Sequence, residues 1–220
     1  ATELGEDDLL IAVVSGGGSS LLSLPVESVP MADLKAVTNS LLRSGAPITE
    51  MNIVRKHLSR VQGGRLAAAC KAPIVTLIIS DVTGDDPSAI ASGPTCADSS
   101  TYQDALDIIR RFNVDAPASV LAHLQAGAAG EKSETPKPGG PELAHASNTV
   151  IATAHQSLTA AADFFRARGI TPVVLGDTVT GEASEVAKVY AALVHEVRAH
   201  AAPFAPPFGL RLGFLFRVAL

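Results

Sequence analysis

The feature that most constrains the fold is an unbroken apolar run at residues 73–79, Pro-Ile-Val-Thr-Leu-Ile-Ile. Its β-branched and aliphatic side chains show no polar alternation, which is typical of a strand buried on both faces. Such strands belong to parallel sheets covered by helices. The chain is 47% hydrophobic but only 4% aromatic and has no Trp, so Ala, Val, Leu and Ile must fill the core. Both observations predict an α/β protein with helices packed on a sheet.

The rest of the chain alternates strand and helix patterns. Four strands are expected, at residues 9–14, 74–80, 149–152 and 171–175, and helices at 31–44, 49–61, 101–112, 117–125, 154–168 and 181–200. Strands that alternate with helices of this length imply right-handed crossovers and a largely parallel sheet. The segment from Gly127 to Pro141, rich in Gly, Pro, Lys and Glu, is interpreted as an exposed loop or short linker.

Composition argues against several classes of protein. The net charge of −5 disfavours a nucleic-acid surface, which would be basic. Cys70 and Cys96 are too few for a disulfide framework and lack metal-ligand spacing, which favours a reducing compartment. No apolar run approaches the ~18 to 20 residues of a membrane span. Residues 1–8 hold four acids and no base, unlike a signal peptide.

The tail from Pro203 onward differs from everything before it. It holds four of the seven Phe residues of the chain, together with three Pro, two Arg and no acid. The segment 203–208 can form neither a helix nor a central strand, because Pro lacks the backbone donor. Two interpretations stay open: a terminal strand that covers the fold, or an appended end.

A glycine-rich loop follows the first predicted strand. Consecutive glycines allow backbone N–H groups to approach a ligand, and the flanking hydroxyls add donors, as in a phosphate cradle. The residues concerned are Ser15, Gly16, Gly17, Gly18 and Ser19. Neither a dinucleotide fingerprint, nor a Walker A loop, nor the nucleophile elbow of serine hydrolases is present in it. The alternative is a flexible turn between strand and helix.

An acidic loop follows the apolar run. Asp81, Asp85 and Asp86 lie within six positions, with Gly84 allowing a sharp bend. Because the carboxyl ends of parallel strands border the ligand crevice of open α/β sheets, this loop is a candidate site. Carboxylates this close repel one another and attract a cation, and oxygen ligands favour Mg²⁺. The alternative is a solvated loop in which one Asp caps a turn.

Two further segments carry polar groups that could bind oxygen atoms. On the helix at 49–61, Asn52, Lys56 and Ser59 lie near one face, and Arg55, Lys56 and Arg65 could hold a phosphate or a small carboxylate. The loop from 81 to 98 is long enough to indicate a function, and it offers donors at Ser92, Gly93 and Thr95. The alternatives are solvated cations and a rigid connector. The six histidines are scattered, without metal-ligand spacing, and are interpreted as surface or helix-face residues.

Five sequence blocks, in this order, resemble the class II glycerate kinases. They are Ser15–Ser19, Asn52–Ser59, Gly63–Ala67, Ser80–Asp86 and Ala91–Thr95, with a weaker likeness at Gly181–Ala183. The resemblance covers residues 8–202 and implies ATP-dependent phosphorylation of D-glycerate, which feeds serine and fructose breakdown into glycolysis. It also implies a Rossmann-like three-layer α/β sandwich at 1–202, followed in the family by a smaller α/β domain across an active-site cleft.

The resemblance gives each candidate residue an expected role. Nucleotide or phosphate binding is expected of Ser15, Gly16, Gly17, Gly18, Ser19, Ser92, Gly93 and Thr95; substrate binding of Asn52, Arg55 and Arg65; catalysis of Lys56, Asp81, Asp85 and Asp86; and Mg²⁺ binding of the same three aspartates. One aspartate would orient the glycerate hydroxyl or remove its proton, while another holds the metal.

The chain also departs from the family pattern. The family has an upstream Gly-Lys-Ala motif, and this chain is expected to start after that point. The family also continues into a whole second domain, which residues 203–220 do not resemble. We therefore expect a truncated kinase or an alternative isoform, with ATP and D-glycerate as partners and no nucleic acid or membrane. The alternative is a catalytically silent module that binds ligand or associates with another copy. A cytoplasmic location is expected, with a mitochondrial one as the alternative.

Overall fold

The computed structural model describes residues 1–179, 181–204 and 208–211. The chain is organised as two compact units. Unit 1 comprises residues 1–80 and 85–151, and unit 2 comprises residues 81–84 and those from Ala152 onward. Within the described ranges, no helix has both the length and the apolar character needed to cross a membrane.

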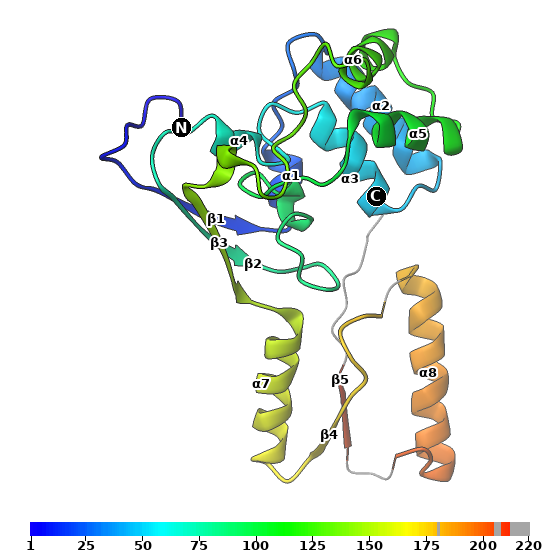
Figure 1. Ribbon diagram of the computed structural model, residues 1–220. Helices are drawn as coiled ribbons and strands as arrows, with labels where there is room; N and C mark the ends of the chain where they lie inside the picture. The colour runs from blue at the N-terminus through cyan, green and yellow to red at the C-terminus, as the bar shows by residue number, and fades with distance from the viewer. Residues whose placement is uncertain (180, 205–207, 212–220) are drawn as a thin grey trace. The chain divides into compact units, whose positions relative to one another are not determined.

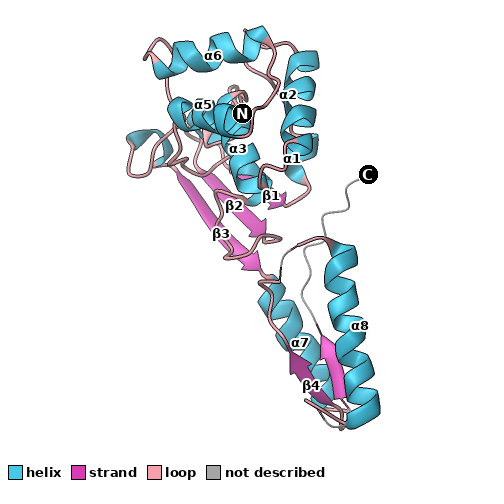
Figure 2. Ribbon diagram, turned by 90° about the vertical axis from the view of Figure 1, so that its right-hand side faces the viewer, coloured by secondary structure: helices cyan, strands magenta, loops and turns pink. Residues whose placement is uncertain are grey.

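Unit 1 is built on a parallel sheet in the order β1-β2-β3 (Figure 1). The strands are β1 (Leu10–Ser15), β2 (Ile74–Ile79) and β3 (Ala146–Ala152). β1 and β2 pair in parallel, with Leu10 opposite Ile74 and Ser15 opposite Ile79. β3 runs in the same direction as its neighbour β2 (Figure 2). The predicted α/β class with a parallel sheet is therefore confirmed, and the carboxyl ends of β1 and β2 lie at the same edge.

Only one face of this sheet packs against the core. In β2 the side chains of Ile74, Thr76 and Ile78 are buried, whereas Val75 and Ile79 are 37% and 45% exposed. In β1, Ile11 is 60% exposed, and it lies opposite Val75. The prediction that residues 73–79 are buried on both faces is wrong in this respect, because an apolar run reports a strand but not what covers it.

The main hydrophobic core of unit 1 lies among helices. These are α2 (Met31–Arg43), α3 (Ile48–His57), α5 (Tyr102–Arg111) and α6 (Ala118–Ala128) (Figure 1). The side chains that fill it recur at helical spacing and include Val37, Leu41, Met51, Val54, Leu58, Tyr102, Ala105, Ile108 and Leu124. The expectation that the helices pack mainly on the sheet holds only for a smaller cluster, formed by Ala67, Cys70, Ala72 and Ile74.

Four short helical segments connect the larger elements of unit 1. They are α1 (Gly18–Leu21), α4 (Arg65–Ala68), and the 3₁₀ turns η1 (Ile90–Ser92) and η2 (Pro141–Leu143). The start of α5 is fixed by a capping box, in which the Thr101 side chain accepts from the Asp104 N–H and the Asp104 carboxylate accepts from the Thr101 N–H. Such caps each contribute ~1 kcal/mol and set where a helix begins.

The described part of unit 2 contains two helices and a small sheet. Its elements are α7 (Ala154–Arg166), β4 (Thr171–Val174), α8 (Ala183–His200) and β5 (Phe208–Arg211). β4 and β5 pair in parallel, with Thr171 opposite Phe208. Within the Phe-rich tail, residues 208–211 form a strand, which begins at Phe208, the last residue of the segment 203–208; residues 205–207 and 212–220 lie outside the described residues. The division into residues 1–202 and 203–220 stays a prediction.

Candidate functional site

The glycine-rich loop connects β1 to α1 at the carboxyl edge of the sheet. Among the described residues other than its chain neighbours, no atom lies within 4 Å of the position that a Cβ of Gly17 would occupy, so the backbone is open on that side. Gly18 lies against the segment 90–95, because a Cβ at Gly18 would be 3.1 Å from the Ala91 Cβ. The structure therefore brings two of the segments predicted to bind phosphate side by side.

Gly63 and Gly64 hold the segment 90–95 in an unusual backbone conformation. Ala91, Ser92 and Gly93 all have left-handed backbones, with φ of 51°, 59° and 55°. The N–H groups of Gly63 and Gly64 donate to the carbonyls of Ser92 and Gly93, at 2.9 and 2.7 Å. A Cβ at Gly64 would lie 2.9 Å from the Cys96 carbonyl oxygen, so this close approach requires glycine.

The polar groups of this segment differ in their hydrogen bonding. The Thr95 hydroxyl donates to Asn148 Oδ1 and accepts from the Thr76 hydroxyl, at 2.6 and 2.9 Å, and the Gly93 N–H donates to the Ile90 carbonyl. Ser92 is fully buried, and its hydroxyl has no hydrogen-bond partner among the described residues. A buried hydroxyl without a partner is costly, and the hydrogen-bonding capacity of Ser92 is unused within the described residues.

Arg55 anchors the glycine-rich loop from α3. Its Nη2 donates to the Ser19 carbonyl at 2.8 Å, and its Nη1 to Asn52 Oδ1 at 3.3 Å. Gln62 donates to the same Ser19 carbonyl, at 3.3 Å. Burial lowers the pKa of the Arg55 guanidinium, and in the described part of the chain no carboxylate forms an ion pair with it. A partly buried cation bonded only to neutral groups favours an anion nearby.

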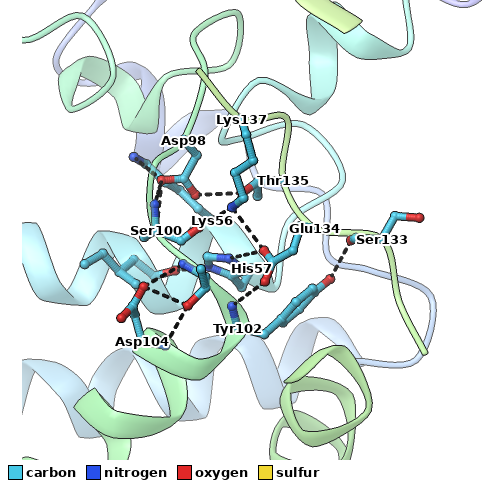
Figure 3. A network of polar contacts seen from close by, with 12 residues as sticks. Lys56, His57, Asp98, Ser100, Tyr102, Asp104, Ser133, Glu134, Thr135 and Lys137 are labelled. Atoms are coloured by element: carbon cyan, nitrogen blue, oxygen red, sulfur yellow. Dashed lines mark hydrogen bonds and ion pairs between the residues drawn. The ribbon is translucent and has the colours of Figure 1, made fainter. Parts of the chain in front are cut away.

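Lys56, the next residue of α3, is buried in a different environment (Figure 3). Its Nζ lies 3.4 Å from Asp98 Oδ1. The Asp98 carboxylate also accepts hydrogen bonds from the N–H and hydroxyl of Ser100 and from the Thr135 hydroxyl. Burial raises the pKa of Asp98, but the Lys56 charge and the Ser100 hydrogen bonds outweigh it, and the pKa lies below its usual value. The catalytic role assigned to Lys56 stays a prediction, and its contacts are those of a structural ion pair.

A second polar cluster, only partly buried, surrounds Glu134 (Figure 3). Its carboxylate accepts from the Tyr102 N–H at 3.0 Å and from Lys137 Nζ at 3.2 Å, and lies 3.2 Å from His57 Nε2. The other ring nitrogen of His57 faces the Ile53 carbonyl at 2.8 Å. Burial raises the pKa of Glu134, yet these donors and charges together hold it below its usual value.

Two of the histidines interpreted as surface or helix-face residues lie on buried faces of helices, His57 on α3 and His123 on α6. His57 is fully buried and His123 is 6% exposed. His123 Nε2 faces the His57 carbonyl and its Nδ1 faces the Ser28 hydroxyl. Burial lowers the pKa of His123, which matches a neutral ring that donates from Nε2 and accepts at Nδ1. These long-range contacts leave no local signal in the sequence.

Arg65 and the acidic loop complete the candidate residues. Arg65 Nη2 donates to the Tyr102 hydroxyl at 3.1 Å and to the Ser133 carbonyl at 3.3 Å, so it joins α4 to the start of α5. Asp86 accepts from the N–H and hydroxyl of Ser88, both at 2.9 Å, and Asp85 has a left-handed backbone.

Asp81, the first acid of the loop, belongs to unit 2. One of its carboxylate oxygens is buried without a hydrogen-bond partner among the described residues, and burial raises its pKa. Over residues 1–179, 181–204 and 208–211, no group of three or more His, Cys, Asp or Glu side chains is arranged to hold a metal ion.

Comparison with known proteins decides the family. The family model described as a domain of unknown function, DUF4147, matches residues 1–125. The chain belongs to the DUF4147 family. The residues matched include the glycine-rich loop, Arg55 and Lys56, the acidic loop and the segment 90–95.

Relatives of this DUF4147 chain carry two kinds of name. A putative hydroxypyruvate reductase of Agrobacterium vitis is 49% identical over 93% of the chain and 45% of its own length. A glycerate 2-kinase of Pyrococcus horikoshii is 40% identical over 94% of the chain and 47% of its own length. The crystal structure of a glycerate kinase from Thermotoga maritima is similar with a TM-score of 0.76 and 34% identity, over 98% of this chain and 50% of that one.

These comparisons confirm the resemblance to glycerate kinases. The chain spans about half the length of the curated relatives that it matches. The roles assigned to individual residues of this DUF4147 chain stay predictions. Within the described residues, Arg55 has no carboxylate partner, and Ser92 Oγ, Asp81 Oδ1 and Arg65 Nε have no hydrogen-bond partner.

Proposed function

We propose that the chain is part of a glycerate kinase, which transfers the terminal phosphoryl group of ATP to a hydroxyl of D-glycerate. The observation that carries this proposal is the meeting of the glycine-rich loop with the segment 90–95, next to the Arg55 guanidinium that has no carboxylate partner within the described residues. Phosphoryl transfer depends on positioning and on charge neutralisation more than on covalent catalysis, and these residues supply both. The names of the kinase relatives agree with it.

The residues take distinct roles in this proposal. Backbone N–H groups of residues 16–18 and the buried Ser92 hydroxyl donate to phosphate oxygens, while Arg55 holds an anionic group and fixes the loop through Ser19. One of Asp81, Asp85 and Asp86 accepts the proton of the attacking hydroxyl, and another holds the metal. Burial raises the pKa of Asp81, and a raised pKa brings a carboxylate closer to the pH at which a general base works best.

Mg²⁺ enters this proposal as part of the co-substrate MgATP. Magnesium is usually held by one or two carboxylates together with phosphate oxygens, rather than by an all-protein cage. The buried Asp81 oxygen that has no hydrogen-bond partner in the described part of the chain fits one such ligand position. Asp85 and Asp86 are the other candidates. A cytoplasmic location belongs to the proposal as well.

The test combines turnover and binding. The purified chain is incubated with ATP, MgCl₂ and D-glycerate while ADP release is followed, and its thermal unfolding is measured with and without these ligands. We expect ligand-dependent stabilisation, since ligands of the folded state raise stability. Where turnover is measurable, replacing Asp81, Asp85 and Asp86 one at a time by Asn should lower it for at least one position. The proposal would be contradicted if the chain showed no turnover and no ligand stabilised it.

A second candidate function, reduction of hydroxypyruvate, is named by the Agrobacterium relative. The glycine-rich loop lacks the Gly-x-Gly-x-x-Gly spacing with which dinucleotide-binding folds approach a pyrophosphate, which favours the kinase. A parallel assay with hydroxypyruvate and NADH or NADPH separates the two. Oxidation of the reduced nucleotide without ADP release from ATP would replace the kinase proposal with the reductase.

A further inference from the structure

A polar groove lies on unit 1 between α1, α2, α3 and the turn that follows α3. Its volume is about 580 Å³, within the range of small-molecule sites. Its polar lining consists of two cations, Lys35 and Arg55, and of neutral side chains that include Ser20, Thr38, Asn39 and Gln62. Among the described residues, neither Asp nor Glu lines it. The groove therefore has a positive charge that its own walls do not neutralise.

Both cations are available to a ligand. Within the described residues, neither Lys35 nor Arg55 has an ion-pair partner. The hydrogen bonds of Arg55 go to a carbonyl and to an amide, which leave its charge uncompensated and part of its donor fork unused. A guanidinium in this state binds carboxylate or phosphate oxygens, often through two parallel hydrogen bonds.

The rest of the lining indicates which kind of anion fits. Apart from the polar residues, the walls are Leu and Met side chains of α1, α2 and the segment between them, and no aromatic ring is among them. A nucleotide base has no stacking surface here. The hydroxyl and amide side chains suit a ligand that carries alcohol groups next to its charge.

We propose that this groove binds a small hydroxy acid, with the ligand carboxylate on Arg55 and Lys35 and its hydroxyls on the neutral polar lining. The preference for an anion follows from the groove alone, whereas the choice of D-glycerate as the hydroxy acid rests on the proposed function. Because Arg55 also holds the Ser19 carbonyl, the bound acid lies next to the glycine-rich loop.

Calorimetric titration of the whole chain tests this assignment, with D-glycerate, inorganic phosphate and the uncharged analogue glycerol as probes. We expect saturable binding of D-glycerate, no binding of glycerol, and affinity lowered about tenfold by Lys35→Met, which corresponds to about 1.4 kcal/mol. Lys35 is exposed on α2, so this variant keeps its fold, whereas Arg55→Met also loosens the glycine-rich loop. Arg60→Met, which removes an exposed cation outside the groove, is the matched control.

Each other outcome is decisive. Equal affinity for D-glycerate in the Lys35→Met and Arg60→Met variants would overturn the groove assignment, and so would the absence of D-glycerate binding. Tighter binding of phosphate than of D-glycerate, weakened by the same variant, would overturn the hydroxy-acid assignment. Binding of D-glycerate that depends on Lys35, without ADP release, supports the groove and counts against the kinase. ADP release together with D-glycerate binding that does not depend on Lys35 supports the kinase and counts against the groove.

Discussion

The buried ion pair between Lys56 and Asp98 offers the sharpest test of the energetics of unit 1. The side chains of Lys56 and Asp98 are 8% and 3% exposed, and Lys56→Met leaves the aspartate without its cation. Breaking a buried pair by removing one partner costs ~3 to 5 kcal/mol. Asp98 retains hydrogen bonds from Ser100 and Thr135, so we expect a loss near the lower end, ~3 kcal/mol. That is a large share of the ~5 to 15 kcal/mol by which domains are stable.

Urea denaturation followed by circular dichroism measures this loss at pH 7. Arg60→Met is the control, because the pair of Arg60 with Glu27 is exposed and such pairs contribute only ~0 to 1 kcal/mol. The double variant Lys56→Met with Asp98→Asn should be less destabilised than the sum of the single variants, since it buries no unpaired charge. A cost for Lys56→Met equal to that of the control would refute the reasoning.

The dependence on pH gives the same pair a second, independent signature. The pKa of Asp98 is lower in the folded chain than in the unfolded chain, so its contribution is fully present above the ordinary Asp pKa. It is lost as the pH falls through the lowered folded value, because the unfolded chain then binds more protons. The wild-type chain should therefore lose more stability on acidification than Asp98→Asn does, as measured by urea titrations between pH 7 and pH 3. Parallel curves for the two would contradict this.

Three further predictions concern single positions of unit 1. Gly127→Ala should lower stability by ~1 to 3 kcal/mol, because a Cβ at this position would lie 2.3 Å from the Tyr102 ring. This cost exceeds the gain from the better helix propensity of Ala, and thermal unfolding measures the difference. Gly64→Ala should also destabilise the chain, by at least ~1 kcal/mol, because φ is 80° and a Cβ would press on the Cys96 carbonyl. An unchanged midpoint of urea unfolding would show that the backbone at Gly64 can shift to accept the Cβ. Ser92→Ala should leave stability unchanged or higher, since its hydroxyl has no partner among the described residues, while it weakens binding of ATP in the thermal-shift assay. Equal ATP binding by the Ser92→Ala variant and the wild type would remove Ser92 from the site.

The sequence located the strands and helices better than it located their surroundings. β2 was predicted at 74–80 and spans Ile74–Ile79, because a β-branched run between Pro and a polar loop has few other conformations. The exposed fraction of Val75 and Ile79 depends on what packs over them, which no local pattern records. The core among α2, α3, α5 and α6 likewise depends on how helices far apart in sequence meet.

In the candidate site too, the sequence identified residues better than it identified the groups that surround them. Arg55 and Lys56 are adjacent in the sequence and were grouped as one basic cluster, yet consecutive helical residues point in directions about 100° apart. Arg55 consequently reaches Ser19, and Lys56 reaches Asp98, 42 residues further along the chain. Asp98 and Glu134 were missed because their partners on α3, Lys56 and His57, lie 42 and 77 residues away in the sequence. Helix geometry alone could have separated the two cations, but not named their partners.

Arg55 has two roles, and both are affected when it is changed to alter ligand preference. One guanidinium both supports the glycine-rich loop and lines the groove, so changing it to suit another ligand also disturbs the loop. Lys35 and Asn39 line the same groove from α2, one turn apart, and within the described residues neither holds the loop. Libraries that aim to shift selectivity among hydroxy acids should therefore vary α2 and keep Arg55 fixed.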